Sequence, residues 1–213
     1  MFFFPIGCLV LILFIFLFAV LFLSIVFHVV TFSFEKLGFS SEATFLILLL
    51  ILLGSVVNIP LIKKKGFYKE KGWFFKKYEI EYQGISINLG GAIIPILISI
   101  FFLTKIPWQP VLTTTIFMVI ICYSLSKIIP GRGITLPAFI PPIFSALFAL
   151  IFSPEFAAPT AFISGVLGTL IGADILKIKK IQKISPGMIS IGGAGVFDGI
   201  FLVGITSVFL TSF

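Results

Sequence analysis

Two aspartates, Asp174 and Asp198, are the residues of this chain best suited to catalysis or ion binding. They are its only Asp residues, and both stand in strongly apolar sequence. An ionisable side chain inside a membrane span costs at least about 2.5–3.5 kcal/mol, so such residues usually face the bundle interior or a wet cavity. Two adjacent carboxyls cannot both ionise cheaply and would share one proton. Such a pair could act as acid and base in peptide hydrolysis, or bind a cation.

Glycines at GxxxG spacing accompany both aspartates. One pattern precedes Asp174 and the other encloses Asp198; the glycines are Gly168, Gly172, Gly195 and Gly199. Small residues at this spacing let helices approach closely. We therefore expect the two aspartate-bearing helices, which are consecutive and antiparallel, to be neighbours, with Gly172, Gly195 and Gly199 supporting the site. The alternative is structural: Asp198 caps a helix start, and Asp174 pairs with Lys177 three residues later.

The composition indicates the setting of these residues. The chain has 213 residues, 59% of them hydrophobic and 11% charged, and its mean hydropathy is +1.25. A soluble domain is roughly a quarter charged, so a water-soluble fold is excluded. The net charge of +7 then belongs to the polar loops of a membrane protein and not to a nucleic-acid interface. The lipid bilayer is the expected partner, with a membrane protein or peptide as the expected substrate.

Apolar runs predict an all-α, polytopic bundle of about seven transmembrane helices in a single domain over 1–213. A span needs roughly 20 apolar residues. The first span has no basic segment before it and no small-residue cleavage site, so we expect a retained helix rather than a signal peptide. The predicted spans are 6–30, 43–62, 88–104, 109–127, 138–153, 157–176 and 193–212.

The basic residues predict the orientation. With seven spans, thirteen of the fifteen Lys and Arg residues fall on one side, most of them in the loops 63–83 and 177–187. Lys36 and Lys105 are left on the other side. Because basic residues are enriched in cytoplasmic loops, the N-terminus should be cytoplasmic and the C-terminus external.

Two stretches of the chain resemble each other and predict a parallel repeat of helix pairs. Residues 53–63 align without gaps to 167–177, and Ile-Ser-Ile at 85–87 recurs at 189–191, each followed by glycines. In such a repeat, Asn58 and Asn88 occupy the region that the aspartates occupy in the other half. The alternating Ile-Ser-Ile stretches also predict a short cytoplasmic β-element. If 189–192 is extended, the last helix begins near Gly193 and Asp198 lies five residues inside it.

We expect neither a cofactor nor a metal. The chain has no zinc, haem or phosphate-loop signature, and its two cysteines, Cys8 and Cys122, lie in apolar spans without CxxC spacing. The only histidine, His28, stands without Cys, His or acidic neighbours and cannot assemble a catalytic triad.

Three motifs resemble a family of prokaryotic membrane proteins called domain of unknown function 1614. They are Pro137-Ala138-Phe139-Ile140-Pro141-Pro142, 168–176 and 191–202. A looser resemblance is to the GxGD intramembrane aspartyl proteases, which include presenilin. There one catalytic Asp lies on an out-to-in helix and the other on the next helix, as Asp174 and Asp198 do. Gly195 and Asp198 match the GxGD motif, whereas Phe197 replaces its second Gly. No Pro-Ala-Leu motif follows Asp198, and the candidate for a distant substitute is the stretch from Pro137 to Pro142, which includes Pro141.

Three functions are consistent with these residues. The first is an intramembrane aspartyl protease with an Asp174–Asp198 dyad. The second is a cation- or proton-coupled transporter or channel, in which Asn58 and Asn88 join the aspartates. The third is a non-catalytic membrane scaffold, which applies if the aspartates are not adjacent.

Overall fold

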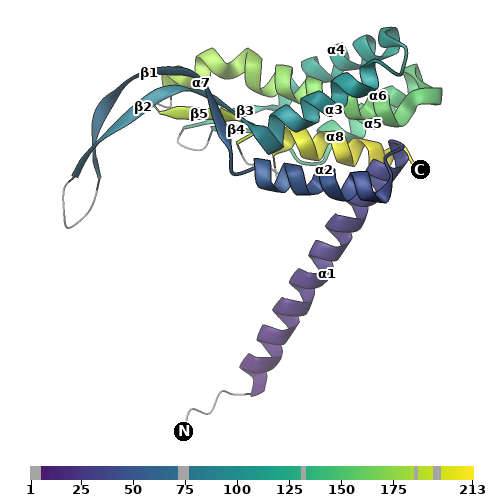
Figure 1. Cartoon of the computed structure of the whole chain (residues 1–213), viewed down its shortest axis with the longest axis horizontal. Helices are drawn as coiled ribbons and strands as arrows, with labels where there is room; N and C mark the ends of the chain where they lie inside the picture. The colour runs from purple at the N-terminus through teal and green to yellow at the C-terminus, as the bar shows by residue number, and fades with distance from the viewer. Residues whose placement is uncertain (1–5, 72–76, 131–132, 185–186, 194–197) are drawn as a thin grey trace.

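The structure is a computed structural model that describes residues 6–71, 77–130, 133–184, 187–193 and 198–213. Most of these residues are helical, and several apolar helices run side by side (Figure 1). The helices are α1 (Ile6–Lys36), α2 (Ser41–Gly54), α3 (Ile94–Leu103), α4 (Trp108–Leu125), α5 (Ile140–Phe152), α6 (Ala157–Thr169), α7 (Ile178–Ile184) and α8 (Gly199–Leu210). The strands are β1 (Asn58–Lys71), β2 (Lys77–Asn88), β3 (Lys127–Ile129), β4 (Gly133–Thr135) and β5 (Met188–Ile191).

Short turns of other helix types join or extend these helices. A π-helical turn, η1 (Leu89–Ile93), leads into α3, and a 3₁₀ turn, η2 (Pro154–Phe156), precedes α6. A second π-helical turn, η3 (Leu170–Asp174), and a 3₁₀ turn, η4 (Ile175–Lys177), connect α6 to α7.

Each of the seven predicted spans coincides with an apolar helix among the described residues. Three of these helices are long and apolar enough to cross a bilayer: Gly7–Lys36, Trp108–Leu125 and Pro154–Ile184. Four are shorter: Ser41–Gly54, Leu89–Leu103, Ile140–Phe152 and Gly199–Leu210. The apolar helices suggest a membrane protein of mostly helical fold.

Several of the predicted boundaries are wrong. The span 43–62 ends as a helix at Gly54, and Asn58 begins a strand that contains Pro60, which is tolerated because β1 is an edge strand. The last helix begins at Gly199, six residues later than Gly193. The loops 63–83 and 177–187 are in part regular structure: the first lies in the β1–β2 hairpin, and the second contains α7.

A three-stranded sheet confirms the predicted β-element. Its order is β1-β2-β5, and β5 pairs in parallel with β2. The register joins the two Ile-Ser-Ile stretches residue by residue: Ile85 with Ile189, Ser86 with Ser190, and Ile87 with Ile191. The recurrence of this tripeptide thus reflects two strands that pair with each other.

The predicted repeat of helix pairs is wrong over its first half. Residues 58–63 are strand, whereas their aligned counterparts 172–177 are the helical turns η3 and η4. Both stretches are apolar and follow a helix end that contains Gly. These shared features explain why the two sequences align although their structures differ.

Helix α6 is the centre of the bundle. It packs against α3, α4, α5 and α8, and most of its residues are buried. It lies close to α8 at Gly165, where an added Cβ would lie 3.2 Å from the Cα of Gly204. The two aspartate-bearing segments are therefore neighbours, as predicted.

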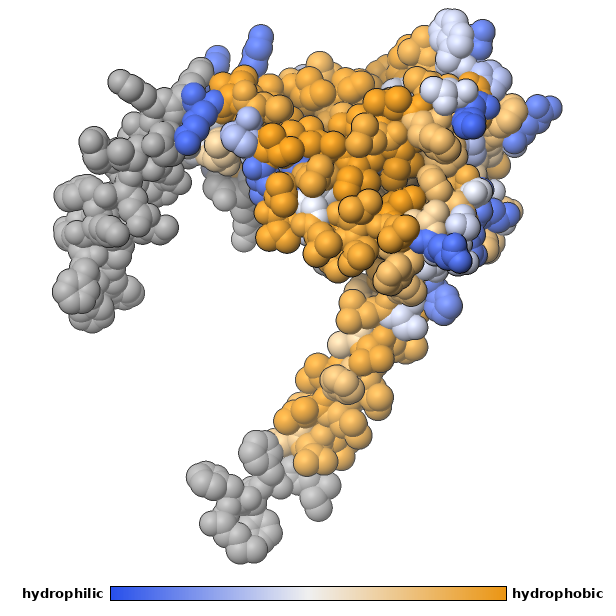
Figure 2. All heavy atoms as spheres, in the orientation of Figure 1, coloured by the Kyte–Doolittle hydropathy of each residue, from blue (hydrophilic) through white to orange (hydrophobic). Residues whose placement is uncertain are grey.

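The outer surface of the bundle is apolar. Figure 2 shows hydrophobic residues over the body and along α1, with hydrophilic residues gathered toward the two ends of the body. Helix α1 exposes Leu, Ile, Val and Phe side chains along most of its length and joins the core only near its C-terminal end, through Val30 and Phe34. This distribution suits a bundle whose outer surface is covered by lipid.

Candidate functional site

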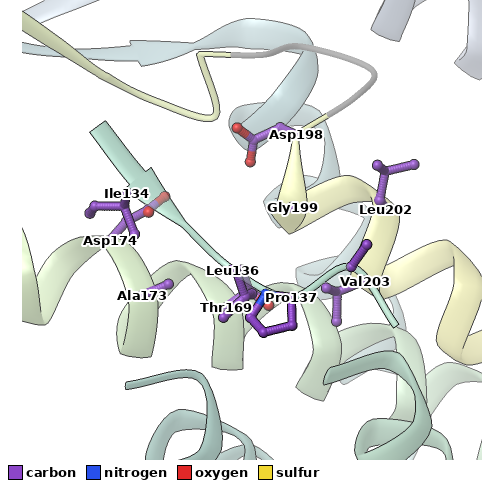
Figure 3. Close-up of a pocket in the computed structure, with 11 residues that line it drawn as sticks. Ile134, Leu136, Pro137, Thr169, Ala173, Asp174, Asp198, Gly199, Leu202 and Val203 are labelled. Atoms are coloured by element: carbon purple, nitrogen blue, oxygen red, sulfur yellow. The ribbon is translucent and has the colours of Figure 1, made fainter. Parts of the chain in front are cut away.

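Asp174 and Asp198 line one pocket of about 180 Å³. Its walls come from three places: η3 and the end of α6, the start of α8, and the chain from β4 to α5 (Figure 3). Figure 3 shows both carboxyl groups directed toward the pocket from different elements. The lining residues are Ile134, Leu136, Pro137, Ala138, Thr169, Ala173, Asp174, Asp198, Gly199, Leu202 and Val203.

Asp198 is the N-cap of α8, as the structural alternative predicts. Its backbone is extended, with φ −72° and ψ 145°, and its Oδ1 accepts a hydrogen bond from the Ile200 N–H at 3.0 Å. The expectation that Asp198 lies five residues inside the helix is wrong, because α8 begins at Gly199. Capping engages one of the two carboxylate oxygens, each of which has two lone-pair sites.

Asp174 is the last residue of η3, and its side chain is half-buried. It lines the same pocket as Asp198. Two carboxyls held close together in a site of low polarity favour a state that carries one proton between them.

Lys177 is directed away from Asp174. Its Nζ donates a hydrogen bond to the Ser126 carbonyl and lies 4.8 Å from the centroid of the Tyr123 ring. The predicted i+3 pairing of Asp174 with Lys177 is wrong, because no ion pair joins these two described residues. The 3₁₀ turn η4 carries Lys177 toward the end of α4.

The supporting glycines have different roles from those predicted. An added Cβ at Gly168 would lie 2.4 Å from the Met118 Cβ, and one at Gly172 would lie 2.4 Å from the Val119 carbonyl. Both glycines therefore pack against α4 and not against α8. At Gly199 the nearest atom to an added Cβ is the Thr169 Cγ2, at 3.8 Å. Gly195 lies outside the described residues.

Asn58 and Asn88 do not line the pocket. They pair in the β1–β2 register, and the Asn88 Nδ2 donates to the Asn58 Oδ1 at 3.2 Å and to the Ser55 carbonyl at 2.7 Å. The Asn88 Oδ1 caps η1 by accepting from the Gly91 N–H at 2.8 Å. The Ser190 hydroxyl donates to the Asn58 Oδ1. These amides join α2, the sheet and α3, which is a structural role.

Pro141 and Pro142 are buried in the first turn of α5 and do not line the pocket either. Pro137 and Ala138, from the same motif, do line it. Pro is favoured at the first turn of a helix, where the missing N–H has no intrahelical partner to lose. The motif thus divides into a pocket wall and a helix start.

Thr169 is a pocket residue that sequence reasoning missed. It is 3% exposed and stands five residues before Asp174, a spacing that an α-helix does not bring onto one face. Only the π-helical turn that follows it aligns the two residues, and apolarity in the sequence gives no signal for such a turn.

No group of three or more His, Cys, Asp or Glu side chains that could hold a metal ion occurs within the described ranges. The Cys122 thiol is buried and lies 3.6 Å from the Thr169 hydroxyl. The lining residues with polar side chains are Asp174, Asp198 and Thr169.

These features define the class: a mostly helical protein, whose apolar helices suggest a membrane setting, with two carboxyls that line one pocket. The chain belongs to the family described as protein of unknown function (DUF1614), which matches residues 52–210 and so includes both aspartates. No curated protein and no solved structure matches the chain. The resemblance to GxGD proteases stays a prediction.

Proposed function

We propose that the chain is an intramembrane aspartyl protease-like hydrolase that cleaves a peptide bond in or near a membrane segment. The observation that carries the proposal is that Asp174 and Asp198, from different elements, line the same pocket. The pocket is many times larger than the roughly 10–15 Å³ that one water needs, so it has room for a water and a substrate carbonyl together.

The chemistry requires the two carboxyls in different protonation states. The ionised carboxylate takes a proton from water as that water attacks the peptide carbonyl, while the protonated partner donates a hydrogen bond to the carbonyl oxygen. A tetrahedral intermediate results, and return of a proton to the leaving amine breaks the C–N bond. Two carboxyls that line one pocket favour this singly protonated state, because their mutual repulsion opposes the ionisation of both.

The chain from Ile134 to Ala138 supports a peptide substrate. It is not helical after β4 ends at Thr135, and it forms one wall of the pocket. In this arrangement Pro137-Ala138-Phe139 stands in the role of the Pro-Ala-Leu motif of GxGD proteases. The remaining lining is largely apolar, which suits residues drawn from a membrane segment.

Replacement of each aspartate by Asn tests this function. Asn caps helices about as well as Asp, so D198N keeps the α8 cap and removes only the acid. We expect D174N and D198N each to lower cleavage of co-expressed membrane substrates by at least about a hundredfold. The double variant should be no worse than either single variant, because the pair acts as a unit.

The matched control is E155Q, which removes a carboxylate outside the pocket, in η2, and should leave cleavage unchanged. Undiminished cleavage in both single Asn variants would contradict the proposal.

Proton- or cation-coupled transport is the second candidate. The π-helical turn at Asp174 favours it, because interruptions of membrane helices commonly line ion sites. Reconstituted protein would then carry ions or protons into liposomes, with D174N and D198N at background flux. Background flux of the unsubstituted chain across ions and pH gradients would exclude this function.

We also propose that the chain is multi-pass, with its N-terminus and the sheet on the cytoplasmic side. This orientation is supported by the distribution of lysines between the two ends of the bundle. Lys177, Lys179, Lys180 and Lys183 lie in η4 and α7, whereas Lys36 is the last residue of α1 and Lys105 follows α3. Figure 1 shows α7 close to the sheet, and the C-terminal ends of α1 and α3 away from it. The positive-inside rule then directs the sheet end to the cytoplasm.

A further inference from the structure

We propose that Thr169 is a positioning residue for the Asp174–Asp198 pair, and that the π-helical turn η3 is what sets it beside Asp174. The proposal deepens the proposed function, on which its catalytic readout rests. The position of Thr169 beside the two aspartates does not depend on the proposed function, because Thr169 lines the pocket together with both of them.

The width of η3 decides which residues share the pocket wall. In an α-helix, a residue five positions on is rotated by about 140° around the axis. In a π-helical turn the hydrogen bonds run from residue i to i+5, so residues five apart come close to the same face. Thr169 and Asp174 are five apart and are joined by η3. They consequently lie on one wall, together with Ala173.

The contact between this segment and α4 explains why the π-helical turn is needed. Gly168 and Gly172 must face α4, where no Cβ fits between them and Met118 or Val119. A regular helix that kept this contact would rotate Asp174 away from Thr169. The turn η3 satisfies both demands at once.

Thr169 also reaches the second aspartate-bearing segment. Its Cγ2 lies 3.8 Å from the position that a Cβ on Gly199 would take, directly after Asp198. Thr169 is therefore placed between the two segments that supply the carboxyls.

The Thr169 hydroxyl differs from those helix hydroxyls that donate to a backbone carbonyl of their own helix. Ser99 and Thr114, for example, donate to the carbonyls four residues earlier, at 2.9 and 2.8 Å. Within the described residues, the Thr169 hydroxyl contacts only the Cys122 thiol, a weak hydrogen-bonding group, at 3.6 Å. Its hydrogen-bonding capacity therefore remains for a carboxylate or for water bound between the carboxyls.

A hydroxyl that donates to an ionised carboxylate stabilises the charged form. Its removal should favour the protonated carboxyl and weaken the base that activates water. We expect T169V, which keeps the shape of the side chain, to lower kcat for cleavage about tenfold to a hundredfold and to leave KM within about twofold. T169S, which keeps the hydroxyl, should restore most of the activity.

The experiment also uses a readout that does not depend on cleavage. Dicyclohexylcarbodiimide reacts with protonated carboxyls, and peptide mass spectrometry measures its rate of reaction at Asp174 and Asp198 in the purified full chain. T169V should raise that rate severalfold, whereas T169S should match the unsubstituted chain. The control is T115V, because Thr115 on α4 has a buried hydroxyl with no hydrogen-bond partner among the described residues and does not line the pocket.

The outcomes are distinct. An unchanged labelling rate in T169V, or a T169S variant that behaves like T169V, would overturn the positioning role. A raised labelling rate in T169V alone supports it. If labelling responds in this way but the unsubstituted chain cleaves no membrane substrate, the positioning role stands and the proposed function fails. Thermal unfolding of each variant in detergent confirms that it is folded.

Discussion

Asn88 has the most demanding hydrogen-bonding environment of the polar side chains described. It is fully buried, and its amide meets Ser55, Asn58 and Gly91. The amide thereby holds the end of α2 against the start of α3 and fixes the base of the hairpin. The sequence singled out Asn58 and Asn88 as candidate site residues, but it did not predict their structural role. Two amides in apolar sequence are equally consistent with an ion site and with a structural contact.

Replacement of Asn88 should therefore destabilise the fold without requiring any ligand. N88A leaves the Ser55 carbonyl and the Gly91 N–H without their partner, and unsatisfied buried groups cost about 1–3 kcal/mol each. We expect a loss of about 2–4 kcal/mol in the free energy of unfolding, measured by denaturation in mild detergent. N88D keeps the Oδ1 acceptor for Gly91 and should lose less. Equal stability of N88A and the unsubstituted chain would contradict the structural role.

At the scale of elements, hydropathy located the apolar helices but not their ends. The strand at Asn58–Ile62 continues an apolar run after α2, and periodicity cannot separate a short apolar strand from a helix. The Ile-Ser-Ile strands were predictable because they alternate. The turn η3 was not, since it depends on how Gly168 and Gly172 pack on α4. Both aspartates were identified by charge alone, whereas Thr169 required the three-dimensional turn.

The packing of η3 predicts opposite results for two glycines near the pocket. An added Cβ at Gly172 would lie 2.4 Å from the Val119 carbonyl and 3.0 Å from the Tyr123 N, so backbone must shift. G172A should lower the free energy of unfolding by about 1–3 kcal/mol. At Gly199, the first residue of α8, the nearest contact is 3.8 Å. G199A should be neutral or slightly stabilising, because Ala favours a helix. Comparable losses in both variants, by thermal unfolding in the same detergent, would contradict this packing.

At the scale of the whole molecule, the sheet and α7 lie together at one end of the helix bundle (Figure 1). The pocket is lined by η3, by the start of α8 and by the chain from β4 to α5. The parallel pairing of β5 with β2 brings the chain that precedes α8 beside the hairpin. If the chain spans the membrane as proposed, the site lies toward the sheet end of the bundle and so near one membrane surface. A hydrolase needs access for water from one side, whereas a transporter needs access from both in turn.

Labelling of single cysteines can determine which side this is. In a chain with Cys8 and Cys122 replaced by Ser, K183C lies on α7 at the sheet end, and K105C follows α3 at the opposite end. Lys183 and Lys105 are both exposed. With the proposed orientation, a membrane-impermeant maleimide should label K105C in intact cells and K183C only after the membrane is opened. K36C, which ends α1, should behave as K105C does. Labelling of K183C in intact cells, or of both ends from one side, would contradict the orientation and with it the cytoplasmic position of the pocket.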